Sequence, residues 1–342
     1  QTIPDFELQP VETMATKPRP KVAPKVLRDF QAEAIQRVRK SLVSGAMRPL
    51  LMAPTGAGKT TIAAKIIQSA IGKGKRVIFC VPRISLINQT VESFWAEGIS
   101  DIGVIQGIHE LTNHKHPVQV ASIDTLKNRK IPHADLVIID ECHMMRKFYK
   151  KWMDEWSNTR FIGLSATPWA KGLGTVYDDL IIAETVSGLI ERGYLSDFVV
   201  YVPSKADISD CRTVATANGM DYHNGDLEQA HDKPHLRADI VKAWETLGEK
   251  LPALCFAVNR AHARHLQNDF NRAGHKAAYI DAYTEIEERE EIGRLFNARK
   301  IDVVCNVGTL TTGVDWDVRV LILARSTKSE MLFQQIIGRG LR

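Results

Sequence analysis

The sequence lacks the cysteine patterns of disulfide-rich or zinc-binding folds and the long apolar runs of membrane spans. Its five cysteines are scattered and contain no CxxC pair, which argues against a disulfide framework or a zinc site and favours buried thiols in a reducing cytosol. No apolar run approaches the ~20 residues that a membrane span needs, and no signal peptide is visible. No repeat recurs at a fixed period, which excludes solenoid and array architectures.

The 342 residues suit two domains of roughly 150 residues each. The net charge of +5 allows an anionic partner without requiring one, because a solvated surface alone can produce this mild excess. The sequence begins at Gln1 rather than Met and stops at Arg342, directly after a charged motif. We therefore expect a fragment of a longer protein, with further domains or subunits beyond its ends.

The order of apolar runs predicts an α/β fold. Residues 1–25 hold five prolines and are interpreted as a tail or linker. From Val26 onward, short apolar runs alternate with amphipathic stretches, which is typical of parallel sheets covered by helices on both faces. The alternation weakens over about residues 200–235 and then restarts. The predicted strands are 49–53, 76–81, 102–105, 118–122, 136–140 and 161–165, then 251–258, 276–281, 301–306 and 318–324.

Residues 50–61, LLMAPTGAGKTT, predict a phosphate-binding loop between a strand and a helix. The pattern GxxxxGK[ST] is met except at its first position, which is Ala53. Gly56 and Gly58 would let backbone N–H groups turn inward, and Lys59 would reach the β and γ phosphates of ATP. The Thr60 hydroxyl would ligate Mg²⁺, and the N-terminus of the following helix would face the anion.

A second motif, LVIIDECH, supplies carboxylates at the end of a predicted strand. Asp140 would hold Mg²⁺ through water, and Glu141 would orient or deprotonate the attacking water. Active sites of open α/β sheets lie at the carboxyl ends of strands, which is where this pair falls. An acidic pair after an apolar strand is a weak signal alone, but it becomes specific when it follows a phosphate-binding loop.

With LLMAPTGAGKT and DECH in one chain, the sequence resembles a superfamily 2 helicase over about Val26–Arg342. VPRISLINQ, ASIDTL, SATP, FAVNRAHA, NVGTLTTGVD and QQIIGRGLR resemble the remaining motifs of that family, in order. Within the family, the chain looks most like the group that contains XPB, UvsW and the motor parts of type I and type III restriction enzymes. The resemblance implies two tandem RecA-like domains, an ATP-binding lobe at 26–183 and an apparently truncated C-terminal lobe at 184–342.

The resemblance also implies roles for individual residues at the ATP site. Those implied to bind the nucleotide are Arg28, Gln31, Pro54, Thr55, Gly56, Ala57, Gly58, Lys59, Thr60, Thr61, Gly313 and Asp315, and those implied to act in hydrolysis are Lys59, Asp140, Glu141, His143, Gln335, Arg339 and Arg342. Arg339 and Arg342 belong to the second lobe, so we expect the ATP site to be complete only when the lobes close. His143 is expected to contact Ser165 or Thr167 of the coupling motif SATP.

A motor that ignores base sequence should contact mostly phosphates. Its expected contacts are Pro82, Arg83, Gln106, Gly107, Ser122, Thr125, Asn259, Arg260, Thr309, Thr311 and Thr312. A capping or turn role explains any single one of them about as well, and an N-cap alone would explain Asn259.

The sequence thus favours an ATP- and Mg²⁺-dependent DNA helicase or translocase, cytoplasmic and nucleoid-associated, of bacterial or phage type. Its expected partner is double-stranded, forked or single-stranded DNA; RNA is disfavoured and a membrane is not expected. Three alternatives stay open: an RNA-stimulated ATPase, a nucleotide-gated clamp that does not unwind, and a P-loop ATPase of another kind, which has no use for QxxGRxxR. Residues 200–235 would form either a strand-separating or lobe-bridging element or a plain linker.

Overall fold

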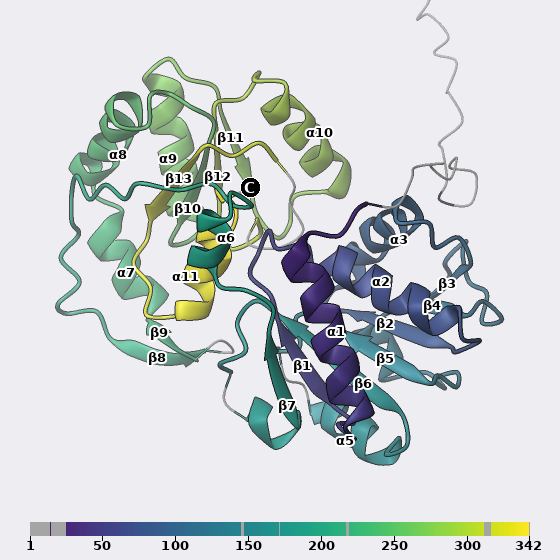
Figure 1. Ribbon diagram of the computed structural model, residues 1–342. Coiled ribbons are helices and arrows are strands. Elements are labelled where there is room, and N and C mark those ends of the chain that lie inside the picture. Colours follow the sequence, from purple (N-terminus) through teal and green to yellow (C-terminus); the bar gives the residue numbers. More distant parts are fainter. Residues whose placement is uncertain are drawn as a thin grey trace, which may run out of the picture. The chain divides into compact units, whose positions relative to one another are not determined.

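The computed structural model describes Met14 and residues 25–144, 147–170, 172–216, 219–310 and 316–341. The chain divides into two compact units, Gln1–Ala53 with Gly58–Ala183 and Pro54–Ala57 with Glu184–Arg342. Each unit contains its own parallel sheet with helices packed against it (Figure 1). The predicted fold class, two α/β units built on parallel sheets, is confirmed.

The sheet of the first unit has the strand order β3-β4-β2-β5-β6-β1-β7, and every neighbouring pair is parallel. All six strands predicted for this unit are present, because runs of apolar residues suit strands covered on both faces. The bounds are β1 Pro49–Met52, β2 Val77–Val81, β3 Ile102–Ile105, β4 Val118–Ser122, β5 Leu136–Ile139, β6 Arg160–Ser165 and β7 Asp179–Ile182.

Strand β7 was not expected from the sequence. It pairs only with β1 and lies at the edge of the sheet. Three of its four residues are exposed, among them Leu180 and Ile182. Such a short segment has neither a continuous apolar run nor an inward-facing stripe, and its pairing with β1 is what makes it a strand.

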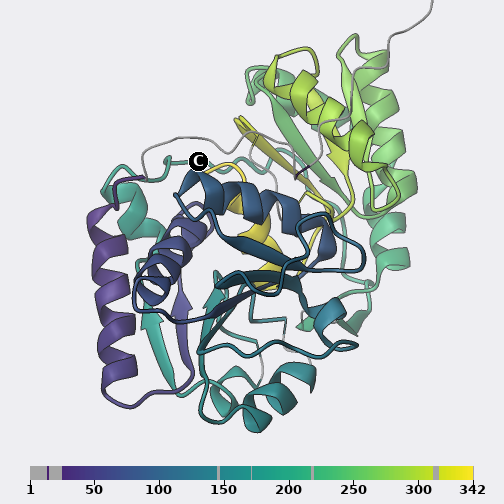
Figure 2. The same ribbon diagram turned by 90° about the vertical axis from the view of Figure 1, so that its right-hand side faces the viewer.

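Helices cover both faces of this first sheet. One face packs against α4 and α5, whose Leu126, Tyr149 and Trp152 share a core with Ile78 and Phe161 of the strands. In Figures 1 and 2 the helices α1, α2 and α3 lie over the strands as a separate layer, and they contact one another in that order. The bounds are α1 Asp29–Val43, α2 Lys59–Ile71, α3 Ile87–Ala96, α4 Ile123–Leu126 and α5 Lys147–Glu155, with short 3₁₀ turns at Ile84–Leu86 and Leu173–Thr175.

The second unit is built on a four-stranded parallel sheet in the order β11-β12-β10-β13. On one face Trp244 and Phe270 meet edge to face, with ring centroids 5.4 Å apart; on the other, Phe296 and Ile336 pack against the strands. The bounds are β10 Ala253–Ala257, β11 Ala277–Ile280, β12 Val303–Asn306 and β13 Val320–Ala324, with α6 Val186–Glu191, α7 Asn224–His231, α8 Pro234–Thr246, α9 Arg260–Arg272, α10 Ile286–Asn297 and α11 Glu330–Ile337.

The stretch that lacks periodicity in the sequence contains regular structure. Strands β8 (Thr213–Thr216) and β9 (Gly219–Tyr222) form an antiparallel hairpin, and α7 follows it. The hairpin is anchored at its base, because buried Asp221 accepts hydrogen bonds from the Thr327 hydroxyl (2.9 Å) and the Lys328 backbone N–H (2.8 Å). A plain linker therefore does not describe residues 213–231. The exposed side chains of β8 explain why no apolar pattern marks it.

A buried histidine links the stability of the second unit to pH. His262, in the first turn of α9, is fully buried, and its Nδ1 accepts a hydrogen bond from the Val258 N–H at 3.4 Å. Burial lowers the pKa of His262 to about 4; neighbouring Asp232 raises it, while His231 and Arg237 lower it. In an unfolded chain the pKa would be about 6.5. Below that pH the unfolded state binds a proton that the folded state excludes, so stability is complete above pH ~6.5 and falls toward pH 4.

We predict that the free energy of unfolding of the second unit drops by up to about 3 kcal/mol between pH 7 and pH 4. His262→Gln keeps a hydrogen-bond acceptor but cannot titrate, so it should remove most of that drop. The burial-lowered pKa of His231 leaves a smaller residual dependence. Hydrogen exchange of the β10 and α9 peptides at several pH values would measure the effect. Equal pH dependence in the variant and the wild type would contradict it.

Candidate functional site

The loop that joins β1 to α2 has the backbone of a phosphate cradle. Gly56 and Gly58 have φ angles of 85° and 80°, which a residue with a side chain rarely adopts. The Ala53 N–H donates to the Ser165 carbonyl at 3.0 Å and ties the entry of the loop to β6. Helix α2 begins at Lys59, so its first N–H groups lie at the exit of the loop. Strand, loop and helix thus follow one another as the sequence predicted.

Gln31 lies against this loop. A Cβ atom added to Gly58 would lie 2.5 Å from the Gln31 Nε2, so a side chain there would force the Gln31 amide to move and would also strain the backbone at its φ of 80°. The Gln31 side chain is buried, and its Oε1 accepts a hydrogen bond from the Arg28 N–H at 3.0 Å at the start of α1. The beginning of α1 therefore holds an amide side chain beside the loop, near the start of α2.

The acidic pair and Lys59 come together in the first unit. The Asp140 N–H donates to the Cys80 carbonyl at 2.9 Å, which extends β5 alongside β2. Glu141 follows with a φ of 48°, and its Oε1 lies 3.8 Å from the Lys59 Nζ. The same Nζ donates to the Ala53 carbonyl at 3.5 Å. Lys59 therefore links the loop after β1 to the carboxylates after β5.

The surroundings of the Asp140 carboxyl disfavour its negative charge when no cation is bound. Burial raises its pKa to about 7, the Glu141 charge acts in the same direction, and Lys59 opposes both. A bound cation would ionise such a group, because metal ligands must be deprotonated. No cluster of three acidic, histidine or cysteine side chains suited to a metal occurs in the described part of the chain. This donor set fits Mg²⁺, which binds one or two protein ligands together with water and phosphate oxygens.

A chain of polar contacts leads from the acidic pair to the motif SATP. The His143 Nδ1 lies 3.3 Å from the Glu141 Oε2 and 2.9 Å from the Ser165 Oγ. The Ser165 Oγ in turn accepts a hydrogen bond from the Thr167 N–H at 3.0 Å. All three side chains beyond Glu141 are buried. Burial lowers the pKa of His143, while Glu141 raises it and Lys59 lowers it. The link from His143 to Thr167 is therefore buried.

The expected nucleic-acid contacts of the first unit follow β2, β3 and β4. Because these strands are parallel, all of their carboxyl ends share one edge of the sheet. The residues differ in access: Arg83 and Gly107 are exposed, Gln106 and Thr125 are half-buried, and Pro82 and Ser122 are buried.

Ser122 has a structural role of its own. Its Oγ accepts a hydrogen bond from the Thr125 N–H at 3.3 Å, which caps the N-terminus of α4, and it lies 2.9 Å from the Thr125 hydroxyl. The capping alternative therefore accounts for this serine, whose hydroxyl is turned into the protein.

The second unit places its candidates at the ends of β10 and β12 and after α11. The Asn259 Oδ1 caps α9 by accepting from the His262 N–H at 2.9 Å, whereas Arg260 is 60% exposed. Thr309 is half-buried, and among the described residues its hydroxyl has no hydrogen-bond partner. Gln335 is half-buried on α11, and Arg339 is buried just after it. Thr311, Thr312, Gly313, Asp315 and Arg342 lie outside the described residues.

Three exposed apolar residues at the same edge of the first sheet were not indicated by the sequence. Ile84, Ile108 and Trp169 follow β2, β3 and β6 within four residues, and Ile108 is fully exposed. Each is a single apolar residue in a polar loop, so periodicity gives no signal for it. Only their shared place at the carboxyl edge of the sheet sets them apart from scattered surface residues.

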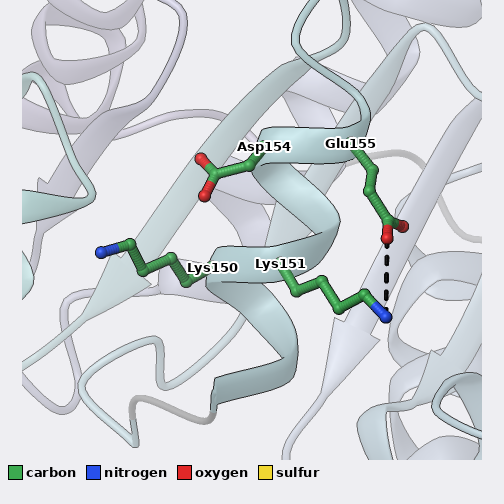
Figure 3. A pocket seen from close by; sticks show the side chains of 4 residues that line it. All are labelled: Lys150, Lys151, Asp154 and Glu155. Carbon is green, nitrogen blue, oxygen red and sulfur yellow. Dashed lines mark ion pairs between the residues drawn. The ribbon is translucent and has the colours of Figure 1, made fainter.

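A surface depression on α5 lies apart from these residues. Lys150, Lys151, Asp154 and Glu155 line it, and Lys151 pairs with Glu155 at 3.7 Å (Figure 3). Its two positive and two negative charges balance, and none of the residues predicted to act lies there. We assign it no role in the candidate site.

A parallel sheet that carries a glycine loop, a lysine and an acidic pair at its carboxyl edge defines the class of P-loop nucleotide-binding proteins. Two family profiles match the sequence: "Type III restriction enzyme, res subunit" over residues 24–170, and "Helicase conserved C-terminal domain" over residues 235–342. The chain belongs to the superfamily 2 helicases, as the order of its motifs predicted.

Curated relatives agree with this assignment. A 51.5 kDa protein of a Lactococcus phage (isolate 7-9) is 30% identical over 86% of this chain and 62% of its own length. The putative ATP-dependent helicase IRC3 of Saccharomyces cerevisiae is 27% identical over 93% of this chain and 49% of its own length. The chain thus spans about half the length of the curated relatives it matches.

Solved structures confirm the architecture. The DUF1998 helicase MrfA bound to DNA superposes with a TM-score of 0.61 at 19% identity, covering 92% of this chain and 44% of that one. At this identity the likeness establishes the fold, two tandem RecA-like domains. Among the helices of the described residues, none combines the length and hydrophobicity that crossing a bilayer requires.

The contact between Gly58 and Gln31 predicts non-additive effects on stability. Gly58→Ala should cost about 1 kcal/mol for its backbone and more for displacing the Gln31 amide. Gly74→Ala is the matched control, because Gly74 has a φ of 70° and an added Cβ would meet nothing within 4 Å. Gln31→Ala should restore part of the stability lost in Gly58→Ala, and should be additive with Gly74→Ala. Urea unfolding of the wild type, the three single variants and both double variants measures this. If the effects on the free energy of unfolding were additive in both double variants, the proposed packing of Gln31 against Gly58 would be ruled out.

Proposed function

We propose that the chain is the motor part of an ATP-dependent DNA helicase or translocase that moves on, or remodels, double-stranded or branched DNA. The observation that carries the proposal is the chain of contacts from half-buried Lys59 and Glu141 to buried His143 and Ser165. It connects a phosphate-binding loop to a motif beyond the hydrolytic residues. A protein that only bound nucleotide would have no need of such a connection.

The residues around the loop fit ATP and Mg²⁺. The N–H groups of residues 54–61 and the Lys59 ammonium would hold the phosphates, and Gln31, supported by Arg28, would meet the adenine edge. Asp140 and the Thr60 hydroxyl would hold Mg²⁺, which when bound neutralises charge on the phosphate oxygens. Gly313 and Asp315 keep the nucleotide-binding role that their motif implies.

Within this site the chain's own groups divide the work of hydrolysis. Glu141 orients the attacking water and accepts its proton, because its carboxylate lies beside Lys59 near the phosphate loop. His143 contacts both the Glu141 carboxylate and the Ser165 hydroxyl through its Nδ1, so a shift of Glu141 is felt at the coupling motif. Gln335, Arg339 and Arg342 would stabilise the charge that develops during phosphoryl transfer.

DNA is proposed as the track on three grounds. The first unit matches the family named for type III restriction enzymes, and MrfA, which has the same fold, was solved bound to DNA. The exposed candidates Arg83, Gly107 and Arg260 suit contacts to a phosphate backbone. A net charge of +5 favours binding to such a polyanion.

The proposal predicts ATP hydrolysis that depends on nucleic acid. The rate of phosphate release should rise strongly with duplex or forked DNA and little with single-stranded RNA. Lys59→Ala serves as the inactive blank. Glu141→Gln should bind ATP with near-normal affinity yet hydrolyse it ~10²–10⁴-fold more slowly, because only the base is removed. Normal turnover in Glu141→Gln would refute the role of Glu141 as the base. Stimulation by RNA alone would show that the track is RNA rather than DNA and would leave the proposed ATP site unchanged.

The hairpin β8–β9 is proposed as a strand-separating element. The side chains of β8 are exposed, while buried Asp221 fixes the base of the hairpin through Thr327 and Lys328. Replacing residues 213–222 by a short Gly-Ser linker should abolish unwinding of a forked duplex while sparing DNA-stimulated ATP hydrolysis. Asp221→Asn, which weakens the base of the hairpin and its ion pair with Arg325, should reduce unwinding partially. Equal loss of unwinding and hydrolysis would show that the hairpin serves the motor as a whole.

A further inference from the structure

A buried carboxylate organises the surface beyond β11. Asp281 directly follows that strand and is only 5% exposed. Its Oδ2 accepts a hydrogen bond from the Tyr279 hydroxyl at 2.7 Å, and its Oδ1 accepts from the backbone N–H groups of Tyr283 (2.9 Å) and Thr284 (3.0 Å). Burial alone would raise the pKa of Asp281, but these hydrogen bonds outweigh it and the pKa is lowered. The carboxylate is therefore a fixed, charged anchor for the turn that carries Tyr283.

The same carboxylate fixes an exposed guanidinium beside an exposed ring. The Arg260 Nε lies 3.1 Å from the Asp281 Oδ2, and the Arg260 Cζ lies 4.9 Å from the centre of the Tyr283 ring. Arg260 is 60% exposed and Tyr283 is 76% exposed. One buried group thus holds two side chains together at the surface, although neither contributes much buried area to the fold.

The position of this pair on the sheet connects it to the proposed nucleic-acid interface. Arg260 follows β10 and Asp281 follows β11, and the two strands flank β12 in the parallel sheet. The Arg260 side chain therefore spans the carboxyl end of β12, after which Thr309 comes. Arg260 and Thr309 are both proposed contacts to the track, whereas Tyr283 was not indicated by the sequence.

We propose that Arg260 and Tyr283 form a platform for one unpaired nucleotide, with Arg260 on its phosphate, Tyr283 stacked on its base and Asp281 as the positioning residue. A tyrosine ring offers a flat apolar face that any base can stack on, and a neighbouring guanidinium adds charge for the phosphate. Glu287 and Glu288 open α10 shortly after Tyr283, so the surface suits bare anions poorly and the stack must carry recognition.

This platform requires a base that is not already stacked within a duplex. The inference rests on the proposed function and narrows its substrate. The preferred DNA carries a single-stranded stretch, such as the arm of a fork, at the second unit. Continuous duplex would meet Arg260 through its phosphates and leave Tyr283 without a base.

The test compares the binding of two single-stranded oligodeoxythymidylates that differ only in a run of abasic sites. Both carry the same charge, so the difference in affinity reports stacking. In fluorescence anisotropy titrations, Tyr283→Ala should bind the intact oligonucleotide about tenfold more weakly and lose its preference over the abasic one. Tyr283→Phe should keep both the wild-type affinity and the preference for the intact oligonucleotide, because its ring can still stack. Tyr201→Ala is the matched control, because Tyr201 is 57% exposed in the same unit, and it should behave as wild type.

Asp281→Asn tests the positioning role. It should reduce the preference for the intact over the abasic oligonucleotide while affinity for blunt duplex stays within about twofold of wild type. If Asp281→Asn fails to fold, the Tyr283 variants still test whether a base stacks on the platform. Unchanged binding in Tyr283→Ala, or an equal loss for intact and abasic oligonucleotides, would overturn the platform. If forked DNA stimulates ATP hydrolysis by the wild type and Tyr283→Ala does not change oligonucleotide binding, only the platform is overturned. If no nucleic acid stimulates ATP hydrolysis by the wild type, the proposed function is overturned.

Discussion

The parallel direction of the strands is the constraint on which the rest of this structure depends. When every strand in a sheet runs the same way, all carboxyl ends lie along one edge, and each loop after a strand opens there. In the first unit this brings the loop after β1, the acidic pair after β5 and the motif after β6 to the same edge as Arg83 and Gly107. Strand order alone therefore brings together residues that are more than 100 positions apart in the sequence.

Buried polar groups turn this shared edge into a connected site. His143, Ser165 and Thr167 are almost fully buried, and burial makes an unsatisfied polar group costly. The His143 and Ser165 side chains contact each other, and Glu141 lies at one end of the series. Thr167 joins it through its backbone N–H, while its buried hydroxyl has no hydrogen-bond partner among the described residues. Such a series has few alternative arrangements, so movement at one end must either be transmitted or break a buried contact. This is the physical basis on which we propose a coupling role for it.

The same principle separates structural from surface roles among the candidates. Ser122 and Asn259 use their side chains to cap helices, which satisfies N–H groups that would otherwise lack partners. Arg260 and Tyr283, in contrast, are held at the surface by Asp281, a buried group that satisfies its own charge through them and their neighbours. A fixed exposed pair is better suited to meet a ligand than a flexible one, because less side-chain entropy is lost on binding.

The sequence by itself determined the two α/β units, ten of their strands and the identity of the phosphate loop, because apolar runs and a glycine-lysine pattern are local signals. It did not reveal β7 or the hairpin β8–β9, whose exposed residues acquire their conformation only from pairing with another strand. The packing of Gln31 on Gly58 and the capping role of Ser122 required the tertiary structure to decide. So did the joining of Arg260 to Tyr283 through Asp281, because it depends on which strands lie side by side, and no spacing along the chain records that order.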